Sequence, residues 1–215
     1  MTLPAAVLSF AFVAGLITVV PGLDTALVLR AAISQGRRQA FATALGINTG
    51  TLAWGAGAAV GVSALLTAST IAYTVVRIAG AAYMIWLGSK MLWSAVRDRD
   101  LDGIETSEST TTAVPVTAWA SWRRGLLTNL LNPKMGAFYV AVLPQFIPAG
   151  ASHLAVGLLL ALVHDAEGML WFTAVIFGAQ WARRWLTRRS AGRAIDGVTG
   201  TVLVGFGLKL SLSTR

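Results

Sequence analysis

Long apolar runs separated by short polar connections dominate the pattern of this 215-residue chain. A helix that crosses a bilayer needs about 20 mostly apolar residues. Six runs come up to that length. The pattern therefore predicts an all-α integral membrane protein with six transmembrane helices. These are expected at Leu3–Arg30, Ala40–Leu66, Ala72–Leu92, Leu126–Ile147, Leu154–Gln180 and Ala194–Leu212.

One long polar stretch interrupts this pattern, at residues 97–121, where acidic residues precede a run of serine and threonine. Such a composition is typical of a flexible linker. Three predicted spans precede it, in residues 1–96, and three follow it, in residues 122–215. We therefore expect two three-helix units joined by a cytoplasmic linker.

The two units resemble each other at matching places. Residues 20–23 read Val-Pro-Gly-Leu inside the first span, and residues 132–135 read Asn-Pro-Lys-Met inside the fourth. Residues 80–90 of the third span also match residues 200–209 of the sixth, with one gap. Because each unit has an odd number of spans, the second must insert upside down relative to the first. The sequence thus predicts two inverted repeats with interrupted helices 1 and 4, an arrangement that builds binding sites in many secondary transporters.

Composition supports a membrane protein. The chain is 55% hydrophobic and 12% charged, against roughly 25% charged residues in soluble domains, and its mean hydropathy is +0.67. These values exclude a disordered protein and argue against a soluble globular domain. The absence of cysteine from the sequence excludes disulfides, iron–sulfur clusters and thiol-ligated metal sites.

The net charge of +8 reflects topology rather than nucleic-acid binding. Arginines gather in the connections after the first, third and fifth predicted spans, and the other two connections carry no Lys or Arg. Positively charged loops stay in the cytoplasm, so we expect both termini outside. Nothing basic precedes Leu3, so the first span is expected to be a permanent helix rather than a signal peptide.

Two predicted helix breaks carry the main candidate residues. Pro21 and Gly22 should bend or break the first helix, and Asp24 follows where the second half-helix would begin, either as a cap or as a binder of a cation or proton. In the fourth span, Asn132 is a natural N-cap before Pro133 and Lys134. Ionisable groups at membrane depth are usually functional. A charge pair between Asp24 and Lys134 fits their corresponding places beside the two breaks, and the sequence leaves open whether the two are paired.

A second polar cluster lies in the fifth span. His164 and Asp165 are adjacent and should not share a helix face, whereas His164 and Glu167 should. Proton relay or substrate contact is favoured over metal binding, because His153, the other histidine, is expected in an outer loop. No cofactor or metal is expected. On the second span, Asn48 is expected to supply a polar contact, and the glycines of 46–50 and 57–61 to pack closely against other helices.

Several segments resemble the LysE/RhtB family of amino-acid exporters. They are residues 21–24, 35–46, 80–88, 125–134, 143–146 and 200–210. The resemblance covers nearly the whole chain, and the Asn-Pro-Lys segment followed by Leu-Pro-Gln-Phe is its most specific part. The family usually has Pro-Gly-Pro at the first break, where this chain has Leu23, so the geometry of that break is not carried over.

The resemblance implies a six-helix exporter in the bacterial inner membrane, driven by the proton gradient, with amino acids or related small zwitterions as substrates. The predicted substrate-binding residues are Pro21, Gly22, Asp24, Asn48, Asn132, Pro133 and Lys134, and the predicted proton-coupling residues are Asp24, His164 and Asp165. The alternatives are a membrane scaffold without transport and a metal-cation exporter. The sequence leaves open the substrate, the proton stoichiometry and whether the chain forms a homo-oligomer.

Overall fold

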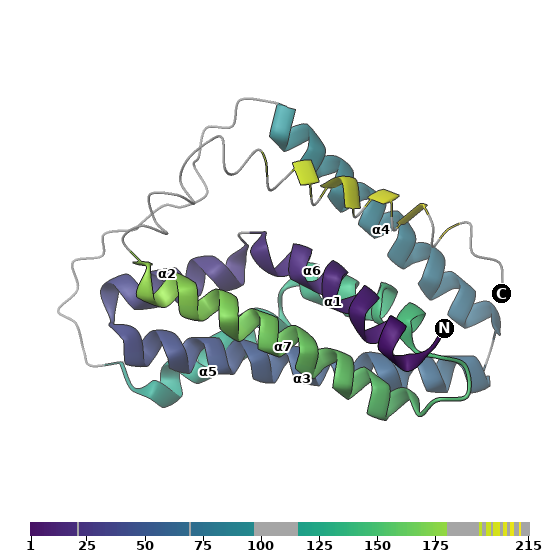
Figure 1. Cartoon of the computed structure of the whole chain (residues 1–215), viewed down its shortest axis with the longest axis horizontal. Coiled ribbons are helices and arrows are strands. Elements are labelled where there is room, and N and C mark those ends of the chain that lie inside the picture. The colour runs from purple at the N-terminus through teal and green to yellow at the C-terminus, as the bar shows by residue number, and fades with distance from the viewer. Residues whose placement is uncertain are drawn as a thin grey trace.

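The computed structural model describes residues 1–20, 22–68, 70–96 and 116–179, together with short stretches between 194 and 211. Every element within these residues is helical (Figure 1). The sixth predicted span and most of the predicted linker therefore lie largely outside the described residues. The elements are α1 (Leu3–Val19), α2 (Leu23–Ser34), α3 (Arg37–Ala68), α4 (Thr70–Val96), α5 (Ala118–Leu130), α6 (Pro133–Ala141), η1 (Leu143–Phe146) and α7 (His153–Phe177).

The first predicted break is confirmed. Helix α1 ends at Val19, α2 begins at Leu23, and the two axes differ by 55°. Pro21 lies outside the described residues, and Gly22 occupies the N-cap position of α2 in an extended conformation. Asp24 lies in the first turn of α2, where the helix dipole favours a negative charge, and its Oδ2 is bonded to Asn129 and Asn132.

The second predicted break is confirmed together with its cap. Helix α5 ends at Leu130 and α6 begins at Pro133, and the side chain of Asn132 accepts a hydrogen bond from the backbone N–H of Lys134 at 3.1 Å. Proline fits the first turn of a helix because the N–H it lacks would have had no partner there. Helix α5 begins at Ala118, inside the stretch expected to be linker.

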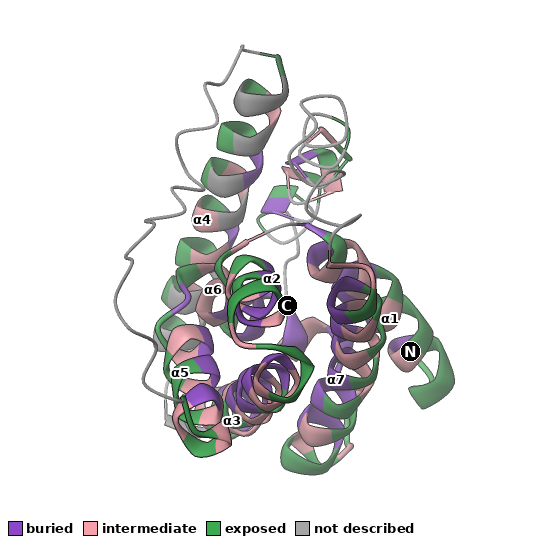
Figure 2. Cartoon of the chain, turned by 90° about the vertical axis from the view of Figure 1, so that its left-hand side faces the viewer, coloured by how far each residue is buried: buried purple, intermediate pink, exposed green. Residues whose placement is uncertain are grey.

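One helix and one bent pair meet the length and apolarity needed to cross a membrane. Within the described residues, α7 qualifies alone, and α1 and α2 qualify together as one broken span. Figure 2 shows α3 and α5 on one side of the bundle and α1 and α7 on the other, with α2 between them. Helix α4 runs at an angle to this group and contacts α3 and α6.

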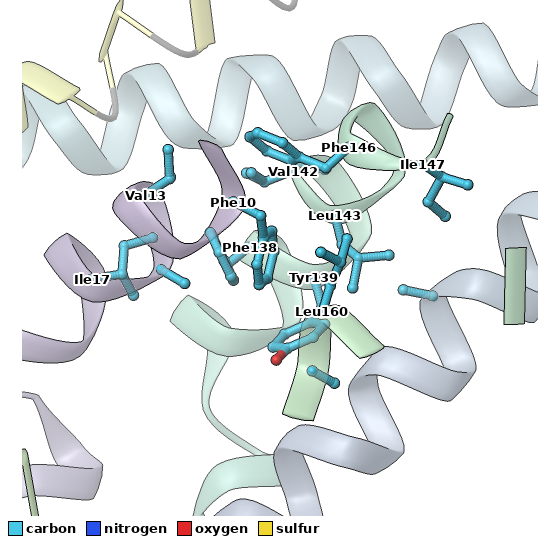
Figure 3. Close-up of a cluster of buried hydrophobic side chains, with 14 of the residues drawn as sticks. Phe10, Val13, Ile17, Phe138, Tyr139, Val142, Leu143, Phe146, Ile147 and Leu160 are labelled. Atoms are coloured by element: carbon cyan, nitrogen blue, oxygen red, sulfur yellow. The ribbon is translucent and has the colours of Figure 1, made fainter. Parts of the chain in front are cut away.

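The interrupted helices of the two halves meet in one apolar cluster (Figure 3). The ring of Phe10 on α1 lies 5.7 Å from that of Phe138 on α6 and 5.5 Å from that of Phe146 on η1. Tyr139 of α6 and Leu160 of α7 are buried in the same cluster. Packing thus holds the break of the first half against the break of the second.

Small residues bring α3 against its neighbours, as predicted for one of the two glycine segments. A Cβ added to Gly46 would overlap the carbonyl oxygen of Trp122, and one added to Gly125 would overlap that of Thr43. The prediction for Gly57 and Gly61 is wrong, because no described atom lies within 4 Å of a Cβ added at either. Gly55 instead makes the close approach from α3 to α7.

We expect Gly46→Ala to destabilise the protein, and Gly57→Ala on the same helix to leave it unchanged or slightly more stable. Overpacking a close contact costs about 1–3 kcal/mol, whereas alanine in an open helical position gains up to about 1 kcal/mol over glycine. Thermal unfolding of the purified protein in detergent measures both. Equal melting temperatures for the two variants would show that α3 and α5 do not approach as closely as described.

Candidate functional site

The two helix breaks lie on one small cavity that is lined by both polar and apolar side chains. Its walls come from α1, α2, α3 and α7 and from the break between α5 and α6, and its volume is about 40 Å³. Pro133 begins α6 without lining the cavity, and Pro21 lies outside the described residues. The other predicted site residues all line it, namely Gly22, Asp24, Asn48, Asn132, Lys134, His164 and Asp165.

Asp24 on α2 is held by two amides from the second half of the chain. Its Oδ2 accepts hydrogen bonds from Nδ2 of Asn129 at 3.0 Å and from Nδ2 of Asn132 at 3.3 Å. Within the described part of the chain, its other oxygen, Oδ1, is buried and has no hydrogen-bond partner. The carboxylate therefore keeps one acceptor oxygen for a ligand or a proton.

Lys134 reaches across to the broken end of α1. Its Nζ donates hydrogen bonds to the carbonyl oxygens of Ile17 at 3.2 Å and Val20 at 3.4 Å. The last carbonyls of a helix lack partners within the helix and carry its partial negative charge, so a cation is stabilised there. The sequence left open whether Asp24 and Lys134 are paired, and among the contacts of these two described residues there is no direct ion pair between them. Both side chains face the same cavity instead.

Helix α7 forms another wall of the cavity. His164 is buried, lies 3.0 Å through Nδ1 from the hydroxyl of Tyr139, and stacks on that ring at 5.8 Å. Asp165 is 8% exposed, and its Oδ1 has no partner among the described atoms. Asn48 Nδ2 donates to the backbone carbonyl of Asp165 at 3.1 Å, which fixes α3 to α7 at the cavity.

His164 and Glu167 both face α1, as their spacing predicts: the ring of His164 lies 6.4 Å from that of Phe10, and Glu167 lies beside Gly15. His164 and Asp165 both line the cavity although they are adjacent in sequence, and Glu167 does not line it. The Glu167 carboxylate lies beside Gly15 of α1, with Oε1 3.7 Å from a Cβ built there. Which α7 side chains line the cavity depends on how the other helices pack around α7, and the spacing along α7 does not specify that packing. No cluster of three potential metal ligands occurs within the described ranges.

The sequence interpretation missed Asn129 as a site residue. Its side chain is 0% exposed, donates to Asp24, and has an Oδ1 without a partner in the described structure. Gly50 of α3 makes room for it, because a Cβ there would lie 2.6 Å from that oxygen. Helical spacing gave no signal for it, because α5 ends at Leu130 and Asn132 lies in the break before α6. The chain turns there, and the N–H of Asn132 donates to the carbonyl of Asn129 at 3.0 Å.

The cavity brings together a carboxylate, an ammonium group and several neutral amide side chains. Asp24 supplies a carboxylate, Lys134 supplies an ammonium group, and Asn48, Asn129 and Asn132 lie around them. These groups are complementary to the two charges of a small zwitterion. A volume of about 40 Å³ is room for a few water molecules, since each needs about 10–15 Å³ of such space.

Comparison with known proteins finds matches along most of the chain. A model of the LysE type translocator family matches residues 16–214. A leucine efflux protein of Enterobacter sp. (strain 638) is 30% identical over 202 residues, which cover 91% of this chain and 90% of that protein. A threonine efflux protein of Escherichia coli (strain K12) is 30% identical over 199 residues, covering 90% and 91%. The membrane protein YrhP of Bacillus subtilis (strain 168) is 30% identical over 207 residues, covering 96% and 98%. No solved structure matches the chain.

Proposed function

The chain belongs to the LysE type translocator family, and on that premise we propose that it is a secondary transporter that exports amino acids by proton antiport. The family is one of transporters rather than enzymes. Its relatives include proteins named for leucine efflux and for threonine efflux. Related small zwitterionic metabolites share the same charged groups and belong to the same substrate class.

The observation that carries the proposal is the placement of opposite charges on one cavity between two broken helices. Asp24 and Lys134 both line that cavity. Lys134 binds the substrate carboxylate, and Asp24 binds the substrate ammonium group. Broken helices at membrane depth are tolerated where they line a cavity or are buried in protein. Transporters place their substrates at such interruptions.

Proton coupling is assigned to the carboxylates and the histidine of the same cavity. Asp24 Oδ1 and Asp165 Oδ1 are buried acceptors without a partner among the described atoms, and a bound proton would let either oxygen donate a hydrogen bond. His164 faces the same space and contacts Tyr139. A proton and a substrate ammonium group competing for Asp24 would give antiport, because binding of one releases the other.

We propose the same topology as the sequence predicts: six spans as two inverted three-helix repeats in the inner membrane, with both termini outside. The breaks in α1–α2 and α5–α6 and their shared apolar cluster support a related pair of units. Because the chain has no cysteine, single introduced thiols report topology without background. We expect an impermeant maleimide to label Thr2→Cys in intact cells and to label Arg38→Cys only after the membrane is opened. The reverse pattern would overturn the orientation.

Transport itself is tested in inside-out membrane vesicles that contain the overexpressed protein. We expect radiolabelled leucine or threonine to accumulate when the lumen is made acidic, since protons leaving the lumen would drive substrate into it. Dissipating the gradient with an ionophore should stop accumulation, and vesicles without the protein provide the control. If no amino acid in a full panel accumulates, and overexpression raises tolerance to one metal ion only, the chain exports cations instead. If nothing is transported, the scaffold alternative holds.

A further inference from the structure

A second cavity lies apart from the proposed substrate site. It has a volume of about 430 Å³, is formed by α2, α3 and the residues from Val116 into α5, and shares no lining residue with the central cavity. Arg30, Arg123 and Arg124 line it, and none of its described lining residues is acidic. It is therefore a concave and strongly basic site to which the export proposal assigns no role.

A buried hydroxyl group also points to a ligand. Ser121, which lines the cavity, is 3% exposed, and its Oγ has no hydrogen-bond partner within the described structure. A buried polar group without a partner costs free energy, and this cost disappears if the side chain turns toward the cavity and a ligand oxygen accepts from the hydroxyl. Gln35 and Thr128 supply further polar side chains to the same wall.

We propose that this cavity binds a phosphate group, carried either by an anionic lipid or by free phosphate. Guanidinium groups bind phosphate oxygens in a bidentate manner, and Ser121 would donate a further hydrogen bond. The cavity lies beside arginine-rich connections, which mark the cytoplasmic side, where basic pockets between helices bind lipid headgroups. Leu127 and Leu131 are exposed and line the same cavity, so an acyl chain would find an apolar contact beside the phosphate.

A competing occupant is the acidic part of the chain itself. Asp98, Asp100, Asp102, Glu105 and Glu108 precede Val116 in the sequence, and Val116 lines the cavity. A carboxylate offers two oxygens and one negative charge to the arginines, whereas phosphate offers more oxygens and a similar or larger charge. Neutralising those five carboxyl groups as amides separates the two occupants.

The test uses the full-length protein, purified in a neutral detergent and freed of anionic lipid. Thermal unfolding is followed while inorganic phosphate is added in one series and phosphatidylglycerol in another, with phosphatidylcholine as the uncharged control lipid. We expect at least one anionic series to raise the melting temperature in a saturable way. Stabilisation by phosphate alone identifies free phosphate, and stabilisation by phosphatidylglycerol alone identifies a lipid headgroup.

Single and double substitutions test whether the anionic ligand binds in this cavity. Each arginine near the membrane surface contributes about 1 kcal/mol to anionic binding, so Arg123→Gln with Arg124→Gln should weaken it about 30-fold. Ser121→Ala should weaken it without changing charge. Arg38→Gln removes an exposed arginine outside the cavity and should leave binding intact.

An unchanged affinity in Ser121→Ala, or an equal loss in Arg38→Gln, overturns the proposal. The proposal is also overturned if the ligands stabilise the protein only after the five acidic residues are changed to amides. It is overturned as well if neither phosphate nor phosphatidylglycerol stabilises the protein. Because binding is measured without transport, these outcomes are independent of the export proposal.

Discussion

Replacing Lys134 by alanine is expected to lower the initial rate of amino-acid export at least about 30-fold. The ammonium group has two carbonyl partners at the end of α1, 3.2 and 3.4 Å away, and faces the cavity that also holds Asp24. Removing one partner of a buried charged contact costs about 2 kcal/mol or more. The substrate carboxylate would then meet a cavity without its cation.

Two companion variants keep this result interpretable. Lys134→Met retains most of the side-chain stem and removes the charge, so it should lose export as Lys134→Ala does if charge rather than volume matters. Lys90→Met removes an exposed lysine on α4, which lies over the ring of Trp86, and should export at the parental rate. Membrane levels are compared by immunoblot. Parental export by Lys134→Met would contradict the assigned role of the ammonium group.

Asp24→Asn is expected to reduce proton-driven accumulation at least about tenfold. An asparagine at this position has nearly the shape of aspartate, and its carbonyl oxygen can still accept from Asn129 and Asn132, the present partners of Oδ2. The substitution therefore removes the charge while it preserves the local fold. A hydrogen bond to a charged group contributes about 1.5–3 kcal/mol, which corresponds to at least a tenfold change in rate or affinity.

Exchange measurements separate the two roles given to Asp24. If this carboxylate binds only the proton, Asp24→Asn should still exchange labelled for unlabelled substrate without a gradient; if it also binds the ammonium group, exchange should fail as well. Glu167→Gln is the matched control, because it amidates a carboxyl group that does not line the cavity. Should Asp24→Asn and Lys134→Ala both export at the parental rate with normal expression, the site is elsewhere.

Local chemistry explains why the helix breaks were predictable. Proline lacks the N–H that continues a helix and clashes with the preceding turn, so residues 21 and 133 mark positions where a helix should bend or break. The side chain of Asn132 caps α6 by bonding to the backbone two residues later, a contact that requires no other helix. Long apolar runs likewise require helices at membrane depth, because only an internally hydrogen-bonded backbone is tolerated there.

Contacts between helices were decided only by the tertiary structure. The sequence places Lys134 and Asp24 near the two breaks, but the orientation of α1 determines that the ammonium group meets carbonyl oxygens rather than the carboxylate. The same applies to Asn129, whose partner Asp24 is more than one hundred residues away in the chain. Spacing along a helix fixes which side chains share a face and leaves open what that face meets.

Close packing shows the same division between sequence and tertiary structure. Gly46 and Gly57 are both glycines of one helix, yet Gly46 lies against the backbone of α5 and Gly57 faces open space. The sequence by itself determined the helical class, the two interruptions and the small set of charged residues near them, because these follow from backbone hydrogen bonding and the cost of burying charge. Only the tertiary structure decided which of those residues share one cavity, because that depends on how the helices pack.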